Sequence, residues 1–132
     1  MAKPYLKPGF VLSRVVNPLL TTFRLVPTLA VRGRSTGEWR TVPVNVLDLD
    51  GSRYLVAPRG DTNWVRNLRA AGTGELRTKH GTEAFRATEV GDANKQPIID
   101  AYLARWGSQV KSQFAQLPDA ADHPVFRIEP AT

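Results

Sequence analysis

The sequence contains no cysteine and has only two histidines, His80 and His123, among its 132 residues. The lack of cysteine excludes a disulfide framework, a thiolate zinc site, an iron–sulfur cluster and a cysteine nucleophile. The two histidines are far apart and have no carboxylates at ligand spacing, so we expect no metal site. No apolar run approaches the about 18 residues of a membrane span, and no secretory signal pattern opens the chain. These absences predict a cytoplasmic protein.

The motifs of several enzyme classes are also missing. The sequence has no Gly-x-Ser-x-Gly elbow, no Walker loop and no Gly-x-Gly-x-x-Gly segment after a strand. Hydrolase, nucleotidase and Rossmann-type functions therefore have no support. The acidic residues are scattered, without a close pair on one predicted strand, so hydrolysis by paired carboxylates is not indicated either.

The charge is distributed unevenly along a chain whose net charge is +6. Residues 1–80 hold 13 basic and 5 acidic residues, whereas residues 81–132 hold 5 basic and 7 acidic residues. This excess suggests an anionic partner, namely a ligand with phosphates or carboxylates, an acidic membrane face or nucleic acid. A solvated basic surface is the alternative on charge alone. The three tryptophans are not interleaved with basic residues on one strand, so we expect no nucleic-acid partner.

The first 27 residues differ in pattern from the rest. Apolar pairs recur every four residues between residues 10 and 23, which predicts an amphipathic helix that Pro18 kinks or divides into two short helices. Basic residues flank the apolar stripe, so this helix is either a contact to the inner face of a membrane or a lid on the protein's own core. The length is that of one domain, with residues 1–27 as its helical N-terminal segment and residues 28–132 as its main body.

Short strands with turn signals dominate the main body. We expect strands at residues 29–31, 39–48, 54–57, 76–79, 82–90 and 124–128, with a hairpin turn at Asp50-Gly51. A helix capped by Asp61 or Thr62 ends at Gly72, and a second runs over residues 92–114 with an interruption near Gly107. About six mostly antiparallel strands with peripheral helices predict an α+β fold with a closed or half-closed barrel.

One segment offers a candidate site for an anion. The loop from Gly33 to Gly37 contains small hydroxyl residues and Arg34, and Arg40 follows it. Backbone N–H groups, hydroxyls and guanidinium forks suit a phosphate or a carboxylate. Pro43 cannot donate to a strand ladder, so its strand must lie at an edge, at a bulge or where a ligand approaches. Arg59 could supply a further cation.

Five segments are distinctive in their order and spacing: Gly33-Arg34-Ser35-Thr36-Gly37, Arg40-Thr41-Val42-Pro43, Val56-Ala57-Pro58-Arg59-Gly60, Asn63-Trp64-Val65-Arg66-Asn67-Leu68 and Pro124-Val125-Phe126-Arg127-Ile128-Glu129-Pro130. Together they resemble the deazaflavin-dependent nitroreductase and quinone reductase family of actinobacteria, over nearly the whole chain from about residue 10. The resemblance implies a split β-barrel over residues 28–132 that binds coenzyme F420, a deazaflavin with a phosphate and an oligoglutamate tail. Both groups are anionic, which agrees with the positive charge of residues 1–80.

The resemblance also implies which residues bind the cofactor. In the family, the glycine-bounded loop and the arginine after it hold the phosphate and tail, a role that falls here to Arg34, Ser35, Thr36 and Arg40. Ser35 stands where many relatives have lysine, whereas Arg59 matches a lysine and keeps its charge. The positions that line the deazaflavin ring and its linker are Val42, Pro43, Val56, Ala57, Pro58, Asn63, Trp64 and Asn67.

The implied reaction is hydride transfer from reduced F420 to a small electrophilic acceptor such as a quinone, an enone or a nitro compound. Nitroreductases of the family have a serine where Pro58 stands and tyrosines near Trp106, Gln109 and Ser112, so a quinone or an activated enone is the expected acceptor. Asn45 and Trp106 are the expected acceptor-binding residues, and no catalytic side chain is assigned. The alternative is a non-enzymatic binder of F420, flavin, tetrapyrrole or fatty acid on the same fold.

Overall fold

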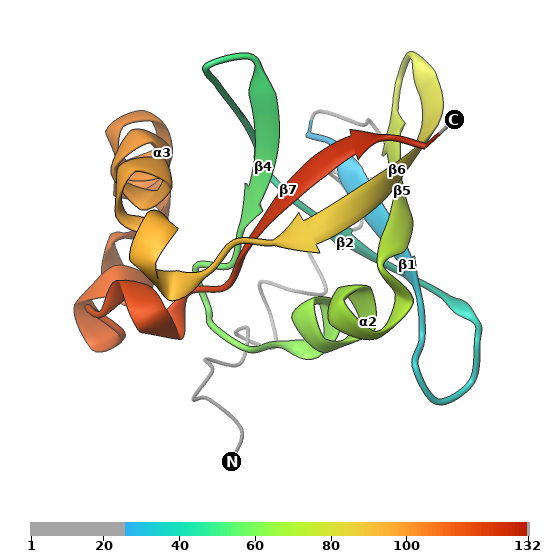
Figure 1. Cartoon of the computed structure of the whole chain (residues 1–132), viewed down its shortest axis with the longest axis horizontal. Coiled ribbons are helices and arrows are strands. Elements are labelled where there is room, and N and C mark those ends of the chain that lie inside the picture. Colours follow the sequence, from blue (N-terminus) through green and yellow to red (C-terminus); the bar gives the residue numbers. More distant parts are fainter. Residues whose placement is uncertain (1–25, 132) are drawn as a thin grey trace.

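The computed structural model describes residues 26–131. Within this range the chain forms a seven-stranded sheet with two α-helices and two 3₁₀ turns (Figure 1). The elements are β1 (Thr28–Arg32), β2 (Trp39–Pro43), β3 (Val46–Leu49), β4 (Ser52–Val56), α2 (Asn63–Ala71), β5 (Thr73–Thr78), β6 (Gly81–Glu89), a 3₁₀ turn at Asp92–Asn94, α3 (Gln96–Gln116), a second 3₁₀ turn at Ala120–Asp122 and β7 (Val125–Pro130).

The sheet has the strand order β2-β1-β5-β6-β7-β4-β3, and every neighbouring pair is antiparallel. β2 and β3 follow each other in the chain but form opposite edges of the sheet. The two residues between them, Val44 and Asn45, therefore connect one edge to the other, which requires the sheet to curl. This curled, open-sided sheet confirms the expected split barrel.

The expectation of one strand over residues 39–48 is wrong, and the sheet has seven strands rather than about six. Val42, Val44 and Val46 alternate with the period of a strand, but β2 ends at Pro43 and β3 begins at Val46. The alternation continues through a crossover because the apolar side chains remain on the inner side of the curl. Pro43 closes the edge strand β2 opposite Thr28, where a missing N–H donor does no harm.

Two local signals in the sequence are confirmed by the backbone. Asp50 and Gly51 have φ angles of 52° and 82°, as a two-residue hairpin turn between β3 and β4 requires. α2 ends at Gly72, whose backbone N–H donates to the Leu68 carbonyl in a left-handed C-cap. Thr62 is the N-cap residue of α2, but its side chain makes no capping hydrogen bond.

The long helix is interrupted as expected, but three residues after Gly107. α3 continues through Gly107 and departs from helical geometry at Val110, where φ is −118° and ψ is 15°. A single glycine costs a helix only about 1 kcal/mol relative to alanine, so Gly107 does not have to end it. Val110 is β-branched and packs into the buried cluster beneath α3, and the backbone bends there.

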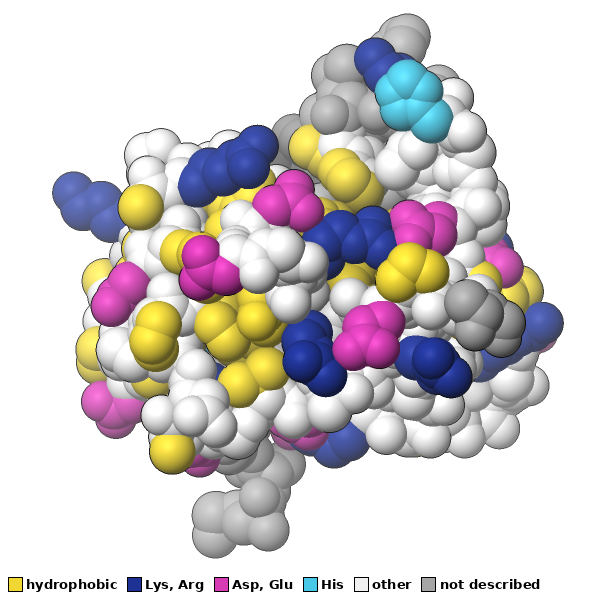
Figure 2. All heavy atoms as spheres, turned by 45° about the horizontal axis from the view of Figure 1, so that its top comes forward, with side chains coloured by type: hydrophobic (Ala, Val, Ile, Leu, Met, Phe, Trp, Pro, Cys, Tyr) yellow, Lys and Arg dark blue, Asp and Glu magenta, His cyan; other side chains and the backbone are white. Residues whose placement is uncertain are grey.

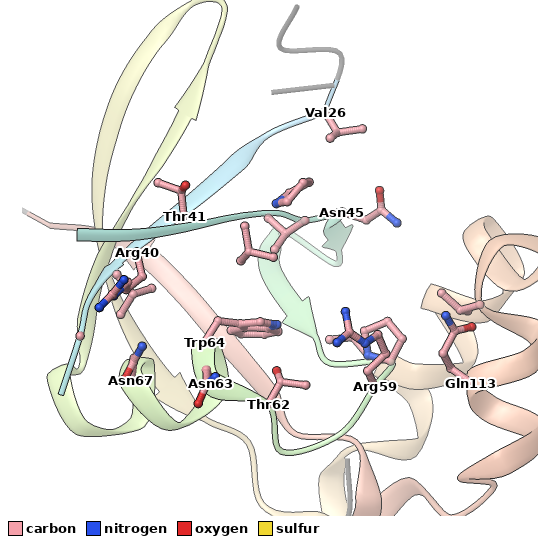
Figure 3. A pocket seen from close by; sticks show the side chains of 18 of the residues that line it. Val26, Arg40, Thr41, Asn45, Arg59, Thr62, Asn63, Trp64, Asn67 and Gln113 are labelled. Carbon is pink, nitrogen blue, oxygen red and sulfur yellow. The ribbon is translucent and has the colours of Figure 1, made fainter. Parts of the chain in front are cut away.

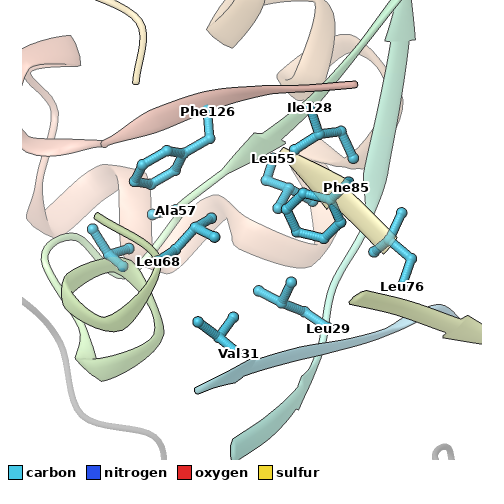
Figure 4. Close-up of a cluster of buried hydrophobic side chains, with 10 residues drawn as sticks. Leu29, Val31, Leu55, Ala57, Leu68, Leu76, Phe85, Phe126 and Ile128 are labelled. Atoms are coloured by element: carbon cyan, nitrogen blue, oxygen red, sulfur yellow. The ribbon is translucent and has the colours of Figure 1, made fainter. Parts of the chain in front are cut away.

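Two clusters of buried side chains hold the helices to the sheet. The larger lies inside the curl, beneath α2, as Figure 4 shows; its members are Leu29, Val31, Leu55, Ala57, Val65, Leu68, Leu76, Phe85, Phe126 and Ile128. Burying each large member contributes about 1.5–3 kcal/mol. The second anchors α3 to β3 and β4; its members are Leu47, Val56, Ile98, Ile99, Tyr102, Val110 and Val125. The two helices are thus fixed at different sides of the sheet.

The amphipathic helix expected at residues 10–23 lies outside the described residues, and so does the membrane contact or lid that it was expected to make. Among residues 26–131, no helix has the length and apolar character that crossing a membrane requires.

Candidate functional site

A cavity of about 1110 Å³ lies between the curled sheet and the two helices. This volume exceeds the about 300–1,000 Å³ that is usual for small-molecule sites, so an extended ligand fits. The cavity is bordered by the β1–β2 loop, β2, the crossover to β3, the end of β4, the start of α2 and one face of α3. Its lining residues are Val26, Val31, Gly33, Arg34, Ser35, Thr36, Arg40, Thr41, Val42, Pro43, Val44, Asn45, Val56, Pro58, Arg59, Thr62, Asn63, Trp64, Asn67, Tyr102, Gln109, Val110 and Gln113.

The β1–β2 loop is closed by its own backbone. The Gly33 N–H donates to the Glu38 carbonyl at 2.7 Å, and the Gly37 N–H donates to the Gly33 carbonyl at 2.8 Å. Gly37 has a φ of 75°, a left-handed conformation that glycine adopts without strain. The Thr36 hydroxyl accepts a hydrogen bond from the Glu38 N–H at 3.2 Å. The loop is therefore a fixed wall of the cavity.

Arg34 is anchored to α2 by neutral amide groups. Asn67 Oδ1 accepts hydrogen bonds from the Arg34 backbone N–H at 3.1 Å and from Nη1 at 2.7 Å. Asn63, one turn earlier, accepts from Nη2 at 3.5 Å. Asn67 is buried, so its amide holds the guanidinium in a fixed place. Because an amide oxygen carries no net charge, this anchor leaves the positive charge of Arg34 available to an anion.

The charge of the cavity wall has one sign. Arg34, Arg40 and Arg59 line the cavity, and none of the described lining residues is Asp or Glu. Arg40 is 60% exposed and lies 3.9 Å from the exposed Glu38, a separation typical of a weak pair. Partial burial lowers the pKa of Arg59, because desolvation disfavours its charged form. An arginine nevertheless keeps its proton at neutral pH.

Several arginines elsewhere on the molecule bond directly to carboxylates. Arg53 makes two hydrogen bonds to Glu83, and Arg69 makes two to Glu89 and one to Asp61. Figure 2 shows the resulting mixture on one face, where Lys and Arg side chains lie beside Asp and Glu. The described lining of the cavity, with three arginines and no carboxylate, differs from this mixed face.

The middle of the cavity is apolar. Its aliphatic lining residues are Val31, Val42, Pro43, Val44, Val56, Pro58 and Val110. The Trp64 ring packs against the buried Phe126, with ring centroids 6.2 Å apart, and this contact holds the indole in place. In Figure 3, Trp64 separates Arg40 and Asn67 at one end from Arg59 and Gln113 at the other. The cavity thus has a flat apolar centre between two polar ends.

The hydroxyl of Thr62 is the only buried side-chain oxygen or nitrogen in the described part of the chain without a hydrogen-bond partner. Thr62 lines the cavity, and Figure 3 shows its side chain beside Trp64 and Arg59. A buried hydroxyl left unpaired costs about 1–3 kcal/mol. Its position at the cavity wall makes it available to a polar atom of a ligand.

The end of the cavity next to α3 carries neutral polar groups. Asn45 Nδ2 donates to the Tyr102 hydroxyl and to Gln109 Oε1, both at 3.4 Å. Tyr102 is 2% exposed. Burial raises the pKa of Tyr102, and the hydrogen bond from Asn45 lowers it by a smaller amount, so the phenol keeps its proton at neutral pH. Among residues 26–131, no group of three or more His, Asp or Glu residues is placed to bind a metal ion.

The structure brings together most of the residues that the sequence singled out. Those that line the cavity are Arg34, Ser35, Thr36, Arg40, Val42, Pro43, Asn45, Val56, Pro58, Arg59, Asn63, Trp64 and Asn67. Ala57 and Trp106 are not among the lining residues. Ala57 is buried in the larger cluster, and its carbonyl accepts from the Gly60 N–H and contacts His123 Nδ1. Trp106 packs on Tyr102, with ring centroids 5.0 Å apart, and on Arg105.

Several lining residues were not identified from the sequence. Tyr102 and Gln113 come from α3, and Thr41 comes from β2. Thr62 was considered only as a helix cap. A signal for the α3 residues exists, because Tyr102, Gln109 and Gln113 follow one another at intervals of seven and four and so share one helix face. That signal becomes useful only when the face is known to border a cavity rather than solvent.

Comparison with known proteins identifies one family and one fold. Residues 13–117 match the family described as F420H(2)-dependent quinone reductase. A comparison with curated protein sequences finds no significant match. Among solved structures, Atu2129 from Agrobacterium tumefaciens, a protein of unknown function, is 20% identical with a TM-score of 0.64. The alignment covers 99% of this chain but only 60% of that protein, which is longer.

Two further structures share the fold. An F420-H2 dependent reductase, FDR-A, is 19% identical with a TM-score of 0.57, over 80% of this chain and 95% of that one. The haem storage protein HutZ from Vibrio cholerae is 13% identical with a TM-score of 0.59, over 87% and 89% of the two chains. At these identities the likeness establishes the split-barrel fold alone.

Proposed function

The chain belongs to the F420H2-dependent quinone reductase family, and from that premise we propose that it transfers a hydride from F420H2 to a quinone or an activated enone. The family gives coenzyme F420 as the cofactor and F420-dependent reduction as the class of reaction. The observation that carries the proposal is the lining of the cavity, with three arginines, no described carboxylate and an apolar centre.

The cationic end of the cavity suits the phosphate and the glutamate tail. Arg34 is held in place by Asn67 and Asn63 before any ligand binds, so little rotamer entropy is lost on binding. Arg40, Ser35 and Thr36 stand on the same side and add a second guanidinium and two hydroxyls. In this proposal these groups fix the anionic part of the cofactor at a distance from the reacting carbon.

The apolar centre suits the deazaflavin ring. Trp64 offers a flat surface, and Val42, Val56 and Pro58 exclude water from the cavity wall. Thr62 supplies a hydroxyl that is otherwise unpaired, which is the feature expected beside a ring or linker with polar atoms. The residues present therefore fit the cofactor that the family implies.

When bound, F420H2 supplies the hydride, so the protein has to orient the reactants and keep water out. Arg34 and Arg40 hold the anionic tail, and Trp64 with Val42 sets the plane in which the ring lies. Gln109 and Gln113 line the α3 end beside Asn45, and their amide N–H groups are suitable donors to an acceptor on the far side of the apolar centre. Binding both partners in one dry cavity makes the transfer effectively unimolecular.

A quinone or an enone suits the α3 end for two reasons. Such acceptors are flat and largely apolar, and Val44 and Val110 are apolar lining residues of the cavity. Quinones and enones also carry carbonyl oxygens, which accept hydrogen bonds from neutral donors. Nitro compounds are a less favoured acceptor here. Pro58 replaces the serine of the family's nitroreductases, and Trp106, Gln109 and Ser112 stand near the positions of their tyrosines.

The test is a titration of the purified protein with F420, followed by the deazaflavin fluorescence. We expect saturable binding at micromolar concentrations, followed by oxidation of F420H2 when a naphthoquinone is added. A lack of saturable binding would overturn the proposed function. Binding without turnover of any quinone or enone would instead favour a non-enzymatic carrier on the same fold.

Haem binding is an alternative to consider, because the haem storage protein HutZ shares this fold. Neither histidine of this chain is placed to ligate a haem in the cavity. His80 lies in the exposed β5–β6 turn, and both ring nitrogens of the buried His123 contact carbonyl oxygens, of Ala57 at 2.9 Å and Leu117 at 2.6 Å. Neither histidine lines the cavity. An F420-dependent reductase is therefore the function that this cavity favours.

A further inference from the structure

We propose that Tyr102 is a catalytic residue, whose phenol binds a carbonyl oxygen of the acceptor and donates a proton to it during reduction. This inference rests on the proposed function, because it concerns the acceptor end of the same cavity. Tyr102 belongs to α3 and lies 57 residues after Asn45, its partner at the β2–β3 crossover.

Tyr102 reaches the cavity only with a small part of its surface. Its ring is 2% exposed and packs in the cluster beneath α3, yet it is one of the lining residues. Its hydroxyl bonds to Asn45, which also lines the cavity and is only partly buried. The ring is therefore held rigidly while its polar end borders the space that a ligand occupies.

The hydrogen bonds leave the phenol proton available. Asn45 Nδ2 uses its two hydrogens on Gln109 Oε1 and on the Tyr102 oxygen, both at 3.4 Å. Tyr102 is the acceptor in the second bond, so its own O–H donates to no side chain in the described part of the chain. A carbonyl oxygen is a suitable partner, because it accepts and cannot donate.

The electrostatic environment keeps the phenol protonated before reaction. Burial raises the pKa of Tyr102, whereas the hydrogen bond from Asn45 lowers it. Among the described residues that line the cavity there is no carboxylate that would compete for the phenol proton. Arg59, on the same side of Trp64 as Gln113 in Figure 3, adds positive charge that favours a developing oxyanion.

The proposed step is balanced in atoms and electrons. A hydride from F420H2 forms a new bond to the acceptor and brings two electrons, which leaves negative charge on the acceptor's carbonyl oxygen. The O–H bond of Tyr102 breaks as its proton moves to that oxygen. A quinone then leaves as the hydroquinone, and an enone leaves as the enol, which tautomerises to the saturated ketone. The tyrosinate keeps the hydrogen bond from Asn45 and regains its proton from solvent.

The first experiment uses Tyr102→Phe, which removes the hydroxyl and keeps the buried ring. The probe is 2-methyl-1,4-naphthoquinone, titrated into the protein without cofactor and followed by quenching of tryptophan fluorescence. We expect its affinity to fall about three- to tenfold, the effect of one lost hydrogen bond, while the affinity for F420 stays unchanged. Tyr54→Phe is the matched control, because Tyr54 on β4 is not one of the lining residues, and it should bind the quinone like the wild type.

Turnover gives a second, independent readout. With F420H2 and the naphthoquinone, Tyr102→Phe should lower kcat about 100-fold or more, as expected when a general acid is lost, and should remove the solvent deuterium isotope effect on kcat. The KM for F420H2 should not change. Wild-type quinone affinity together with wild-type kcat in this variant would overturn the role of Tyr102, while F420 binding would keep the proposed function intact.

A third variant tests the direction of the hydrogen bond. Asn45→Asp replaces the donor with an acceptor, so the Tyr102 proton would be held by the carboxylate and quinone affinity should fall at least as far as in Tyr102→Phe. Unchanged affinity would mean that the phenol already donates to residue 45, which contradicts the proposal. If the wild type fails to bind F420, the proposed function fails, but the quinone titrations without cofactor still decide the carbonyl site.

Discussion

Arginine side chains in this protein differ in the groups that hold them. Arg53 and Arg69 bond to carboxylates, so much of their charge is compensated within the fold. Arg34 is instead bonded to the amide oxygens of Asn63 and Asn67. An amide fixes the position of a guanidinium without neutralising it, which is the arrangement expected where an anion binds.

Arg34→Ala should therefore weaken F420 binding more than Arg40→Ala. We expect a loss of about 1.5–3 kcal/mol for Arg34, because Asn67 and Asn63 hold its guanidinium in place. For Arg40 we expect below about 1 kcal/mol, because its pair with the exposed Glu38, at 3.9 Å, does not fix its position. Fluorescence titrations of both variants measure the difference. Arg127→Ala is the control, because Arg127 pairs with Glu129 on β7 and does not line the cavity. Equal losses for Arg34 and Arg40 would contradict the preorganised anchor.

Thr62→Val separates the stability of the fold from the binding of the cofactor. Valine has the shape of threonine but no hydroxyl, so it removes the unpaired buried oxygen and no capping bond. We expect the free energy of unfolding of the unliganded protein to rise by about 1 kcal/mol and the affinity for F420 to fall by a similar amount. Urea denaturation and fluorescence titration measure the two effects. Thr88→Val, on the exposed side of β6, should change neither, and loss of stability in Thr62→Val would refute the argument.

At the scale of elements, β5 depends on a glycine that is needed for space. A Cβ at Gly74 would lie 2.9 Å from the Ala30 carbonyl oxygen and 2.9 Å from Phe85 Cζ. Ala30 is on β1 and Phe85 is on β6, opposite Gly74. A side chain at this position would therefore press against both strands that pair with β5.

Gly74→Ala should destabilise the protein by about 1–3 kcal/mol, the usual cost of forcing extra volume into a packed interior. Gly91→Ala is the matched control, because a Cβ there meets nothing within 4 Å and its φ of −67° suits alanine. The free energy of unfolding from urea denaturation measures both. A Gly74→Ala protein as stable as the Gly91→Ala protein would mean that β1 and β6 can move apart at no cost.

The elements that the sequence predicts well are those fixed by local chemistry. Asp50-Gly51 predicts a hairpin turn and Gly72 predicts a helix end, because these residue types readily adopt the positive φ angles that both features require. The break between β2 and β3 has no comparable signal in the sequence, because neither Val44 nor Asn45 is a glycine or has a positive φ angle. It follows from the closure of the whole sheet, as the bend at Val110 follows from packing beneath α3.

The molecule as a whole brings together residues that no local pattern relates. The loop around Arg34 was identified from its composition and from family resemblance, because its glycines, hydroxyls and arginines are contiguous. Asn45 contacts Tyr102 and Gln109 only because β3 and α3 pack side by side. The sequence pattern indicates only that Tyr102 is a buried position of a helix. That its hydroxyl borders the cavity is known only from the structure.

Charge at the scale of the whole molecule leads to the last prediction. The chain has a net charge of +6, and its cavity adds three arginines without a described carboxylate, so long-range attraction assists the binding of an anionic cofactor. Raising the salt from about 50 to about 500 mM should weaken binding of F420, and more steeply for longer glutamate tails, because screening acts mainly on exposed charges. The deazaflavin headgroup without phosphate and tail should bind more weakly and with little salt dependence. Equal salt dependence for the headgroup and for F420 would show that the arginines do not hold the tail.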